Sequence, residues 1–300
     1  MKLSIITVCY NNKNGLQKTM ESVANQTFTD YEYIVIDGGS TDGTIELIMN
    51  YDLKSRKELR IKNFKWISEK DNGIYDAMNK GIKMASGEYC YFLNSDDCIA
   101  APNTLEKIFA KVNSDCHCGK SRNRLYIKRL RVKPAMTGNP DIIYGNLAIQ
   151  KNNKLHSVSK FSKKITPYSF YRFKTAIHHQ ASFIKKELFE KYGVFSDKAK
   201  LVSDWIFFFE AIIVHKVRTQ YINRVFALFL SGGESSTGIN EQYIKDDFIQ
   251  TYFSDKQIKK YAKKNRLYKN LRIRKLEKLF GKVFLLYALL NKEIGDRSEE

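Results

Sequence analysis

Apolar runs alternate with helix-like stretches over the first hundred residues, and no other feature constrains the fold as strongly. Residues 3–12 are nearly all apolar and rich in Ile, Val and Tyr, which is typical of a strand buried on both faces of a parallel sheet. Similar runs occur at 33–36, 64–71 and 89–93, and stretches with helical spacing lie between them. Strands that alternate with helices indicate βαβ units. The sequence therefore predicts an α/β fold with a Rossmann-like sheet flanked by helices.

The rhythm changes after the first third of the chain. Residues 113–140 are basic and loop-like, and three segments, DIIYGN, ASFIKKELFEKYG and SDWIFFFEAIIV, predict a short strand, a strand leading into a helix that ends at Gly193, and a buried helix. Residues 256–282 are dense in Lys and Arg, with aromatic and leucine side chains between them. We expect a catalytic domain at 1–236 and a helical basic C-terminal extension at 237–300.

The net charge is +19, from 51 Lys and Arg against 32 Asp and Glu. Such an excess favours a polyanionic partner: nucleic acid, an anionic membrane surface or a phosphorylated substrate. A basic nucleic-acid-binding protein is one alternative, but recognisable RNA and DNA motifs are absent from the sequence and the basic residues are concentrated outside the α/β core. A dinucleotide oxidoreductase is excluded because no G-x-G-x-x-G follows the first strand.

The cysteines bear on the compartment. They are five in number and include no C-x-x-C pair, so a disulfide framework is not expected and a reducing compartment fits. Cys116, His117 and Cys118 lack the second ligand pair that zinc needs. The first apolar run ends at 11–13 without a small-residue cleavage site, and no apolar stretch reaches the roughly 20 residues that cross a bilayer. We expect a cytoplasmic protein, or one bound at the inner face of the cell membrane.

Polar side chains follow each of the first four expected strands. These strand ends carry Tyr10, Asp37, Asp71 and the adjacent pair Asp96 and Asp97. In open α/β sheets, ligands bind beyond the carboxyl ends of the strands. Two adjacent carboxylates repel each other, and a hard divalent cation with oxygen ligands suits such a pair. The alternative is that Asp97 caps the next helix and Asp96 is solvated, and the residues alone leave both interpretations open.

Seven segments also stand in a recognisable order within residues 1–236: SIITVCYN, VIDGGSTDGT, DNGIYDAMNKGIKMASGEYCYFLNSDD, DIIYGN, HHQASFIKKELFEKYG, SDWIFFFEA and SGGESS. Together they resemble the family 2 inverting glycosyltransferases with the GT-A fold, of the bacterial type that builds surface polysaccharides such as capsule or lipopolysaccharide. The resemblance implies a UDP- or GDP-sugar donor, Mn²⁺ or Mg²⁺, a glycan or polyprenyl-diphosphate-linked acceptor, and a single displacement that inverts the anomeric carbon.

The resemblance implies roles for particular residues. Asp37 matches the acid that accepts a hydrogen bond from a base N–H, and Asp96 matches the metal ligand of a D-x-D motif. The first acid of that motif is replaced by Asn94 here, so one protein charge is missing. The donor-binding residues are then Val8, Tyr10, Asp37, Asp71, Lys80, Ser95 and Asp97. The metal ligands are Asp96 and Asp97, with His179 as a further candidate. Asp76 also lies where the family contacts the donor.

Inversion needs a general base that takes the proton of the attacking hydroxyl. In the family this acid opens a helix, and Asp204 stands at that place; the alternative is that Asp204 is only a helix cap. His178 and His179 are candidates for contacts with metal or phosphate, or for local hydrogen bonds. Residues 232–235 are expected to form a flap over the donor, or an ordinary surface turn.

Two further alternatives concern the whole protein. A nucleotidyltransferase that makes a nucleotide sugar would need a Gly-rich basic loop after the first strand, where this chain has Tyr10, Asn11 and Asn12. The basic extension fits an anionic membrane surface, packing on the catalytic domain, or a homodimer. No nucleic-acid partner is expected.

Overall fold

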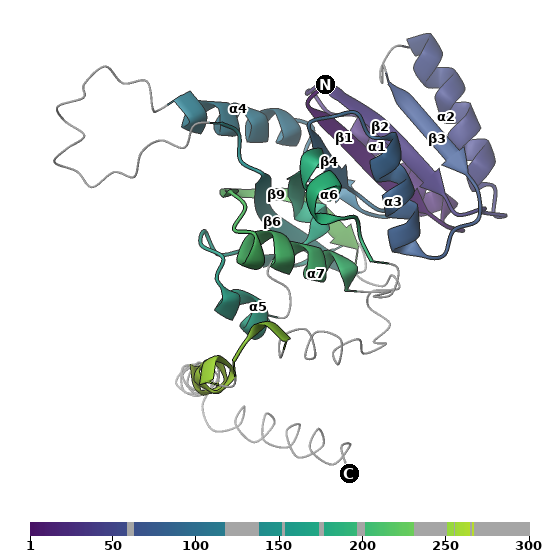
Figure 1. Ribbon diagram of the computed structural model, residues 1–300. Coiled ribbons are helices and arrows are strands. Elements are labelled where there is room, and N and C mark those ends of the chain that lie inside the picture. Colours follow the sequence, from purple (N-terminus) through teal and green to yellow (C-terminus); the bar gives the residue numbers. More distant parts are fainter. Residues whose placement is uncertain are drawn as a thin grey trace, which may run out of the picture.

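The computed structural model describes residues 1–58, 63–117, 138–151, 154–173, 177–196, 202–230, 251–254, 256–264 and 266. A mixed sheet crosses this part of the chain, with helices on both faces (Figure 1). The strands are β1 (Leu3–Cys9), β2 (Tyr31–Asp37), β3 (Phe64–Ser68), β4 (Tyr89–Phe92), β5 (Cys98–Ile99), β6 (Ile142–Lys151), β7 (Lys154–Ser159), β8 (Ser182–Lys185) and β9 (Thr219–Leu230). The helices are α1 (Lys13–Ala24), α2 (Thr44–Glu58), α3 (Ile74–Met84), α4 (Thr104–His117), α5 (Pro167–Phe173), α6 (Lys186–Tyr192) and α7 (Ser203–Phe209), with the short turns η2 (His179–Ala181) and η3 (Glu210–Val214).

The first four strands that were expected from the sequence form the parallel half of the sheet. In the order β3-β2-β1-β4 they are parallel neighbours, and Ile5 of β1 lies opposite Tyr33 on one side and Tyr91 on the other. All residues of β1, β2 and β4 are buried, because helices cover both faces of a parallel sheet. The parallel arrangement places the ends of these strands along one edge.

The second half of the sheet begins where β8 pairs antiparallel with β4. β6 is antiparallel to β8, and β9 runs parallel to β6. Tyr89, the first residue of β4, pairs with Lys185, the last residue of β8. The turn η2, which leads into β8, is therefore brought to the carboxyl edge of β4, beside the loop that follows that strand. This change of direction lets the two halves of the chain share one site.

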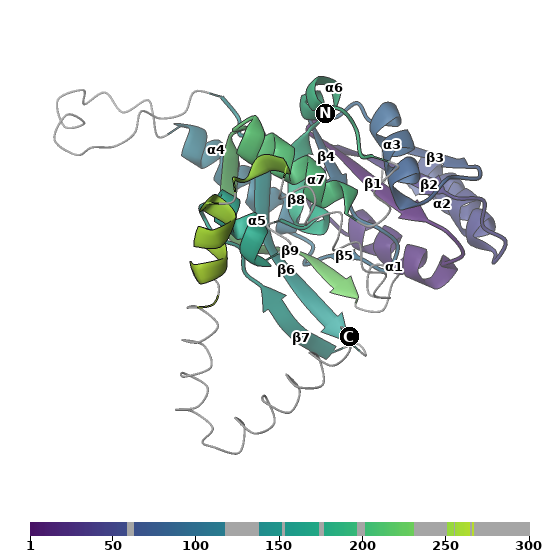
Figure 2. The same ribbon diagram turned by 60° about the horizontal axis from the view of Figure 1, so that its bottom comes forward.

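Two apolar layers hold the helices on the sheet. On one face, Ile6, Val8 and Phe92 pack with residues of α3, α6 and α7. On the other, Leu3 and Ile5 pack with residues of α1, α2 and α4. Figure 2 shows α3, α6 and α7 together on one side of the sheet. Burial of a large aliphatic or aromatic side chain contributes about 1.5–3 kcal/mol, so these layers fix the strand ends firmly.

The structure corrects several expected boundaries. The short strand expected at DIIYGN is the start of β6, which runs on to Lys151 and pairs with β7, a strand that was not expected. The expected loop from residue 113 is helical in its first five residues, because α4 continues to His117, and residues 118–137 lie outside the described residues. The expected buried helix is α7, and it continues into a π-helical turn over Glu210–Val214. The expected flap at 232–235 lies outside the described residues, and so does Cys118.

The described part of the expected basic extension packs on the domain. Phe253 is buried, and its ring lies 5.6 Å from that of Phe209 in α7. Tyr261, in the helix at 256–264, contacts Phe253 and the Tyr168 ring of α5 at 5.7 and 5.5 Å. Within the described residues, helices long and apolar enough for a membrane span are absent.

Candidate functional site

Backbone hydrogen bonds hold the loops after β1, β2 and β4 side by side. Gly38 N donates to Cys9 O at 2.9 Å, Glu69 N to Asp37 O at 3.0 Å, and Ser95 N to Val8 O at 3.1 Å. The polar residues that follow the strands are thus collected at one edge, as the sequence predicted. The Val8 carbonyl is already bonded to Ser95, and the Val8 side chain is buried in the core. A contact of Val8 with a nucleobase would therefore use the backbone, where the carbonyl oxygen has a second lone pair.

Asp96 lies at the surface of this edge, beside the start of α1. Its Oδ2 accepts a hydrogen bond from Asn12 Nδ2 at 2.6 Å, and its Oδ1 lies 3.8 Å from Lys18 Nζ. The residue has φ 77°, a left-handed conformation that costs a non-glycine residue energy and often marks functional sites. Asn12 also caps α1 by accepting from Gly15 N at 3.1 Å. The end of β4 and the beginning of α1 are therefore joined through Asp96.

Asp97 turns inward, away from the surface that Asp96 occupies. Its exposed fraction is 3%, and this burial raises its pKa to about 7, although a hydrogen bond from Gln180 opposes the rise. The residue does not cap α4, whose first turn is bonded to Ala101 and Asn103. The cap alternative for Asp97 is therefore wrong. Because Asp97 is buried, its two oxygens are less accessible to a ligand than those of Asp96.

Four side chains from both halves of the chain form a hydrogen-bonded row. Asn94 Nδ2 lies 3.3 Å from Nε2 of His179, and Nδ1 of His179 lies 2.9 Å from Oδ2 of Asp204. Tyr75, at the start of α3, donates to Oδ1 of Asp204 at 2.9 Å. Both ring nitrogens of His179 are thus engaged, which argues against His179 as a metal ligand. Asp204 is brought to the carboxyl edge of β4 although it lies more than a hundred residues away in sequence.

The Asp204 carboxyl is held in its charged form. Burial by itself would raise its pKa, but the contact with His179 and the hydrogen bonds from the Tyr75 hydroxyl and the Trp205 backbone N–H hold the pKa below its usual range. Hydrogen bonds to a carboxylate favour the ionised form. A carboxylate that is ionised and largely buried at the end of a sheet can accept a proton from a bound molecule.

The carboxylate of Asp37 is occupied by its own loop. Oδ2 accepts from Gly39 N, Ser40 N and Ser68 Oγ at 3.1, 3.0 and 2.6 Å, and Oδ1 accepts from Ser40 Oγ. The residue is fully buried. In this arrangement Asp37 shapes the turn after β2, and it has little capacity left for the base N–H that the resemblance assigned to it.

Asp71 and Tyr10 form the exposed part of the same region. Tyr10 has an exposed fraction of 65%. Both side chains lie against Gly38, because a Cβ placed on Gly38 would come within 2.6 Å of Asp71 Oδ2 and 3.3 Å of Tyr10 Cδ2. Asp71 Oδ1 accepts from Gly73 N at 2.9 Å, which leaves Oδ2 directed at Gly38. An aromatic ring beside a carboxylate is suited to stack a planar base and bond its edge.

Lys80, Asp76 and Ser95 have local partners. Lys80 Nζ lies 2.9 Å from Glu69 Oε1 and 3.9 Å from Asp76 Oδ2, so its charge is balanced within the β3–α3 connection. Ser95 Oγ accepts from Asn12 Nδ2 at 3.3 Å. The cation recorded beside Asp96 is Lys18, which the sequence analysis did not select.

The donor set fits a hard divalent cation only in part. Among the described residues, groups of three His, Cys, Asp or Glu that could hold a metal ion are absent. Asp96 is the accessible carboxylate, and Asn94 Oδ1 is a buried oxygen without a hydrogen-bond partner in that part of the chain. Oxygen ligands of this kind suit Mg²⁺ or Mn²⁺. A cation here would take its remaining ligands from water or from a bound phosphate.

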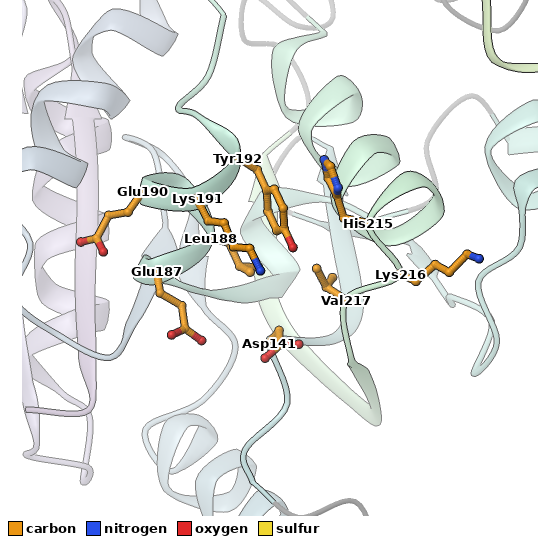
Figure 3. A pocket seen from close by; sticks show the side chains of 9 residues that line it. All are labelled: Asp141, Glu187, Leu188, Glu190, Lys191, Tyr192, His215, Lys216 and Val217. Atoms are coloured by element: carbon orange, nitrogen blue, oxygen red, sulfur yellow. The ribbon is translucent and has the colours of Figure 1, made fainter.

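An open pocket of ≈ 560 Å³ lies elsewhere, at the opposite edge of the sheet. Figure 3 shows its lining, in which the rings of Tyr192 and His215 face each other; these rings stack at 4.0 Å. Asp141, one of three acids in this lining, is bonded to Arg218 and Lys185 at 3.0 and 3.2 Å. Because Asp141 precedes β6 and its partner Lys185 pairs with the first residue of β4, this pocket is separate from the edge that carries Asp96 and Asp204.

Comparisons with known proteins agree with this fold. The model of the family described as "Glycosyl transferase family 2" matches residues 4–193. A PGL/p-HBAD biosynthesis glycosyltransferase of Mycobacterium bovis is 26% identical over 243 residues, which are 81% of this chain and 82% of the relative. An uncharacterized glycosyltransferase of Mycobacterium tuberculosis is 38% identical over 104 residues, 34% of this chain and 37% of that protein.

Solved structures show the same fold. TarS of S. aureus superposes with a TM-score of 0.60 at 17% identity, over 88% of this chain and 43% of the TarS chain. A shorter TarS in complex with UDP-GlcNAc superposes with a TM-score of 0.58 at 20% identity, over 83% of this chain and 65% of that TarS chain. The mannosyltransferase PcManGT from Pyrobaculum calidifontis, in complex with GDP-Man and Mn²⁺, superposes with a TM-score of 0.50 at 16% identity, over 78% of this chain and 58% of the PcManGT chain. The chain spans less than half of the longer TarS. These superpositions confirm the expected GT-A fold.

Proposed function

Because this chain belongs to glycosyl transferase family 2, we propose that it moves a sugar from a nucleotide-sugar donor to a hydroxyl of a glycan or lipid-linked acceptor, with inversion at the anomeric carbon. The observation that carries the proposal is the ionised Asp204 carboxylate, held by His179 and Tyr75 at the edge where the strands end. A single displacement requires one general base that takes the proton of the acceptor hydroxyl, and the Asp204 carboxylate is suited to this role.

Asp204 acts on the acceptor. It accepts the proton of the attacking hydroxyl as that oxygen bonds to the anomeric carbon, while the bond from that carbon to the phosphate oxygen breaks and its electron pair leaves with the nucleotide. Tyr75 and the Trp205 backbone N–H hold one carboxylate oxygen. Asp96, with Asn94 Oδ1 and buried Asp97 nearby, is the place for Mn²⁺ or Mg²⁺. When bound, the cation stabilises the negative charge of the departing diphosphate.

The nucleobase of the donor lies beside Tyr10. Tyr10 supplies an exposed ring, and Asp71 Oδ2 is the carboxylate oxygen directed toward that ring across Gly38. A carboxylate accepts a hydrogen bond from the N–H of uracil or guanine. Two solved neighbours carry UDP-GlcNAc and GDP-Man, and these two nucleotides are the donors to test.

The acid Asp204 tests the proposal most directly. Asp204→Asn keeps the size of the side chain and removes the proton acceptor. It should bind a UDP- or GDP-sugar as the unchanged protein does, measured by calorimetry with Mn²⁺, and lose about 10²–10⁴-fold in transfer rate. Glu190→Gln, an exposed acid paired to Lys186 on α6, is the matched control and should transfer normally. Unreduced transfer by Asp204→Asn would contradict the assignment of the base.

The acceptor side includes the basic extension. Along the helix at 256–264 the lysines are exposed, whereas Ile258 and Tyr261 are half-buried against the domain. A basic outer face attracts anionic lipid by about 1 kcal/mol per Lys near the surface. Alanine at Lys256, Lys259, Lys260 and Lys263 should therefore weaken binding to phosphatidylserine-containing vesicles while the transfer to a soluble acceptor is kept. Unchanged vesicle binding would leave the extension as packing alone.

A further inference from the structure

We propose that His179 is a positioning residue for Asp204, and that Asn94 fixes which nitrogen of His179 carries the proton. This inference rests on the proposed role of Asp204 as the base. It also gives a physical reason for the asparagine that stands where the D-x-D motif has its first acid.

The row of contacts determines the direction of each hydrogen bond. Nδ1 of His179 lies 2.9 Å from Oδ2 of Asp204, and an ionised carboxylate only accepts, so Nδ1 must carry a proton. Nε2 of the same ring lies 3.3 Å from Asn94 Nδ2. An amide nitrogen only donates, so Nε2 accepts and carries no proton. The ring is thereby held as the neutral tautomer with its proton on Nδ1.

An acid at position 94 would not serve this row. An ionised Asp in place of Asn94 accepts hydrogen bonds and cannot donate one, so it would favour a proton on Nε2. The ring would then either turn a lone pair toward Asp204 or become doubly protonated. The amide at 94 removes this conflict. Its other atom, Oδ1, is buried without a hydrogen-bond partner among the described residues, so one side chain serves His179 with its nitrogen and leaves an oxygen for a ligand.

The same bonds select the oxygen of Asp204 that receives the proton. Oδ1 accepts from Tyr75 and from Trp205 N, at 2.9 and 2.8 Å, and both of its lone pairs are then used. Oδ2 accepts from His179 alone among the described partners, which leaves one lone pair. The proton of the acceptor hydroxyl therefore goes to Oδ2, while the hydroxyl oxygen forms its bond to the anomeric carbon and the nucleotide leaves with the electron pair of the broken bond.

The contacts are sheltered enough to hold this arrangement. The side chain of His179 is 12% exposed and that of Asp204 is 17% exposed. His179 lies in η2, immediately before β8, and Gln180 beside it is buried. The turn is anchored by Ala181 N, which donates to His178 O at 3.0 Å. The imidazole is thus fixed by a rigid element, as a positioning group must be.

The tautomer can be observed without any turnover. In the full-length protein labelled with ¹⁵N-histidine, the His179 nitrogens should show the pattern of a neutral ring with the proton on Nδ1, assigned by its loss in His179→Asn. In Asn94→Asp the resonances should move to the Nε2–H or doubly protonated pattern. An Nε2–H pattern in the unchanged protein would overturn the proposal, and so would an Asn94→Asp protein with unchanged shifts.

The second test measures transfer kinetics for substitutions of His179, in which Asn and Gln each replace one of the two ring nitrogens. Asn at 179 places an amide near the position of Nδ1, and Gln places one near Nε2. We expect His179→Ala and His179→Gln to lose about 10–100-fold in kcat with little change in donor KM, as for other groups that orient a functional ligand, and His179→Asn to retain most of the rate. His215→Asn, a ring in the separate pocket, is the control.

Equal rates for the three His179 variants would overturn the positioning role. A raised donor KM with kcat unchanged would also overturn it. Melting temperatures of the variants separate both results from unfolding. The proposed base fails by a different result, full transfer by Asp204→Asn, and in that event the tautomer of His179 is still decided by the resonances.

Discussion

Gly38 and Asp71 lie so close that a side chain at position 38 would collide with the Asp71 carboxylate in its present position. A Cβ on Gly38 would come within 2.6 Å of Asp71 Oδ2. The close approach joins the loop after β2 to the loop after β3, and it holds Asp71 beside the exposed ring of Tyr10. The relationship makes the position of Asp71 dependent on a residue that has no side chain of its own.

Gly38→Ala should therefore move Asp71 and leave the fold in place. The atom that must give way is the end of a flexible side chain, so we expect a stability change below about 1 kcal/mol. Donor affinity should fall about tenfold, the effect of about 1.4 kcal/mol. Calorimetric titration with UDP and GDP measures it. Asp71→Asn should lose a similar share of the donor affinity. Unchanged affinity in both variants would show that the nucleobase binds elsewhere.

Gly15→Ala tests the link between α1 and Asp96. A Cβ there would lie 2.5 Å from Asp96 Cγ and would also collide with the Asn12 amide. Alanine favours helix by about 1 kcal/mol over glycine, which offsets the loss of the Asn12 cap, a cost of about 1 kcal/mol. We expect a loss of Mn²⁺-dependent donor binding, measured by titration with and without the ion. Gln17→Ala, which changes an exposed residue of the same helix, should bind the donor normally. Equal Mn²⁺-dependent donor binding by the two variants would show that Asp96 is not part of the donor site.

Glu32 gives a prediction for pH. It is fully buried in β2, and although burial alone would raise its pKa, hydrogen bonds from Lys65, Ser4 and Ser86 hold the pKa below the ordinary 4.5. A carboxyl with a lowered pKa stabilises the fold above its unfolded pKa and loses that contribution as the pH falls through its folded pKa.

Glu32→Gln should therefore lower the free energy of unfolding by about 1–3 kcal/mol at pH 7, and the difference from the unchanged protein should shrink below pH 4.5. Urea unfolding between pH 7 and pH 3.5 measures it. The exposed acid Glu190 provides a control in Glu190→Gln, with a difference within about 0.5 kcal/mol. A deficit that stays constant down to the lowest pH would contradict the lowered pKa.

Phe253 tests whether the extension is part of the folded domain. Its ring is buried against Phe209 of α7. Phe253→Ala should lower the free energy of unfolding by about 3 kcal/mol, the usual cost of emptying such a site. Leu155→Ala removes an apolar side chain that is 63% exposed and should cost less than about 0.5 kcal/mol. Equal stabilities would mean that the contact with Phe209 is not maintained in solution.

The sequence predicted the parallel half of the sheet well, because its signal is local. Strands buried on both faces need apolar residues throughout, and β1, β2 and β4 carry them. β7 gave no such signal: nearly all of its residues are exposed, and it forms only because β6 lies beside it. The two-residue strand β5 likewise depends on its pairing with β9, which sequence spacing does not reveal.

The site followed the same rule. Asp96, His179 and Asp204 could be selected from the sequence, but the contacts that each of them makes could not. His179 and Asp204 are brought together by the antiparallel pairing of β8 with β4, and Tyr75 joins them from α3. The resemblance assigned Asp37 to a base N–H, yet Ser40, three residues further on, and Ser68, from β3, donate to its oxygens in the fold. Lys80 was likewise selected for a phosphate and is paired with Glu69.

The late arrival of β8 beside β4 has a consequence for how the protein is made. β4 is complete at residue 92, whereas the strand that covers its edge begins at residue 182. A chain growing from the ribosome therefore carries a buried-type apolar strand with an open edge while about ninety more residues are synthesised. Open edges of this kind invite pairing with other chains. We expect the yield of soluble protein to depend on chaperones and on growth temperature more than the stability of the finished fold would suggest.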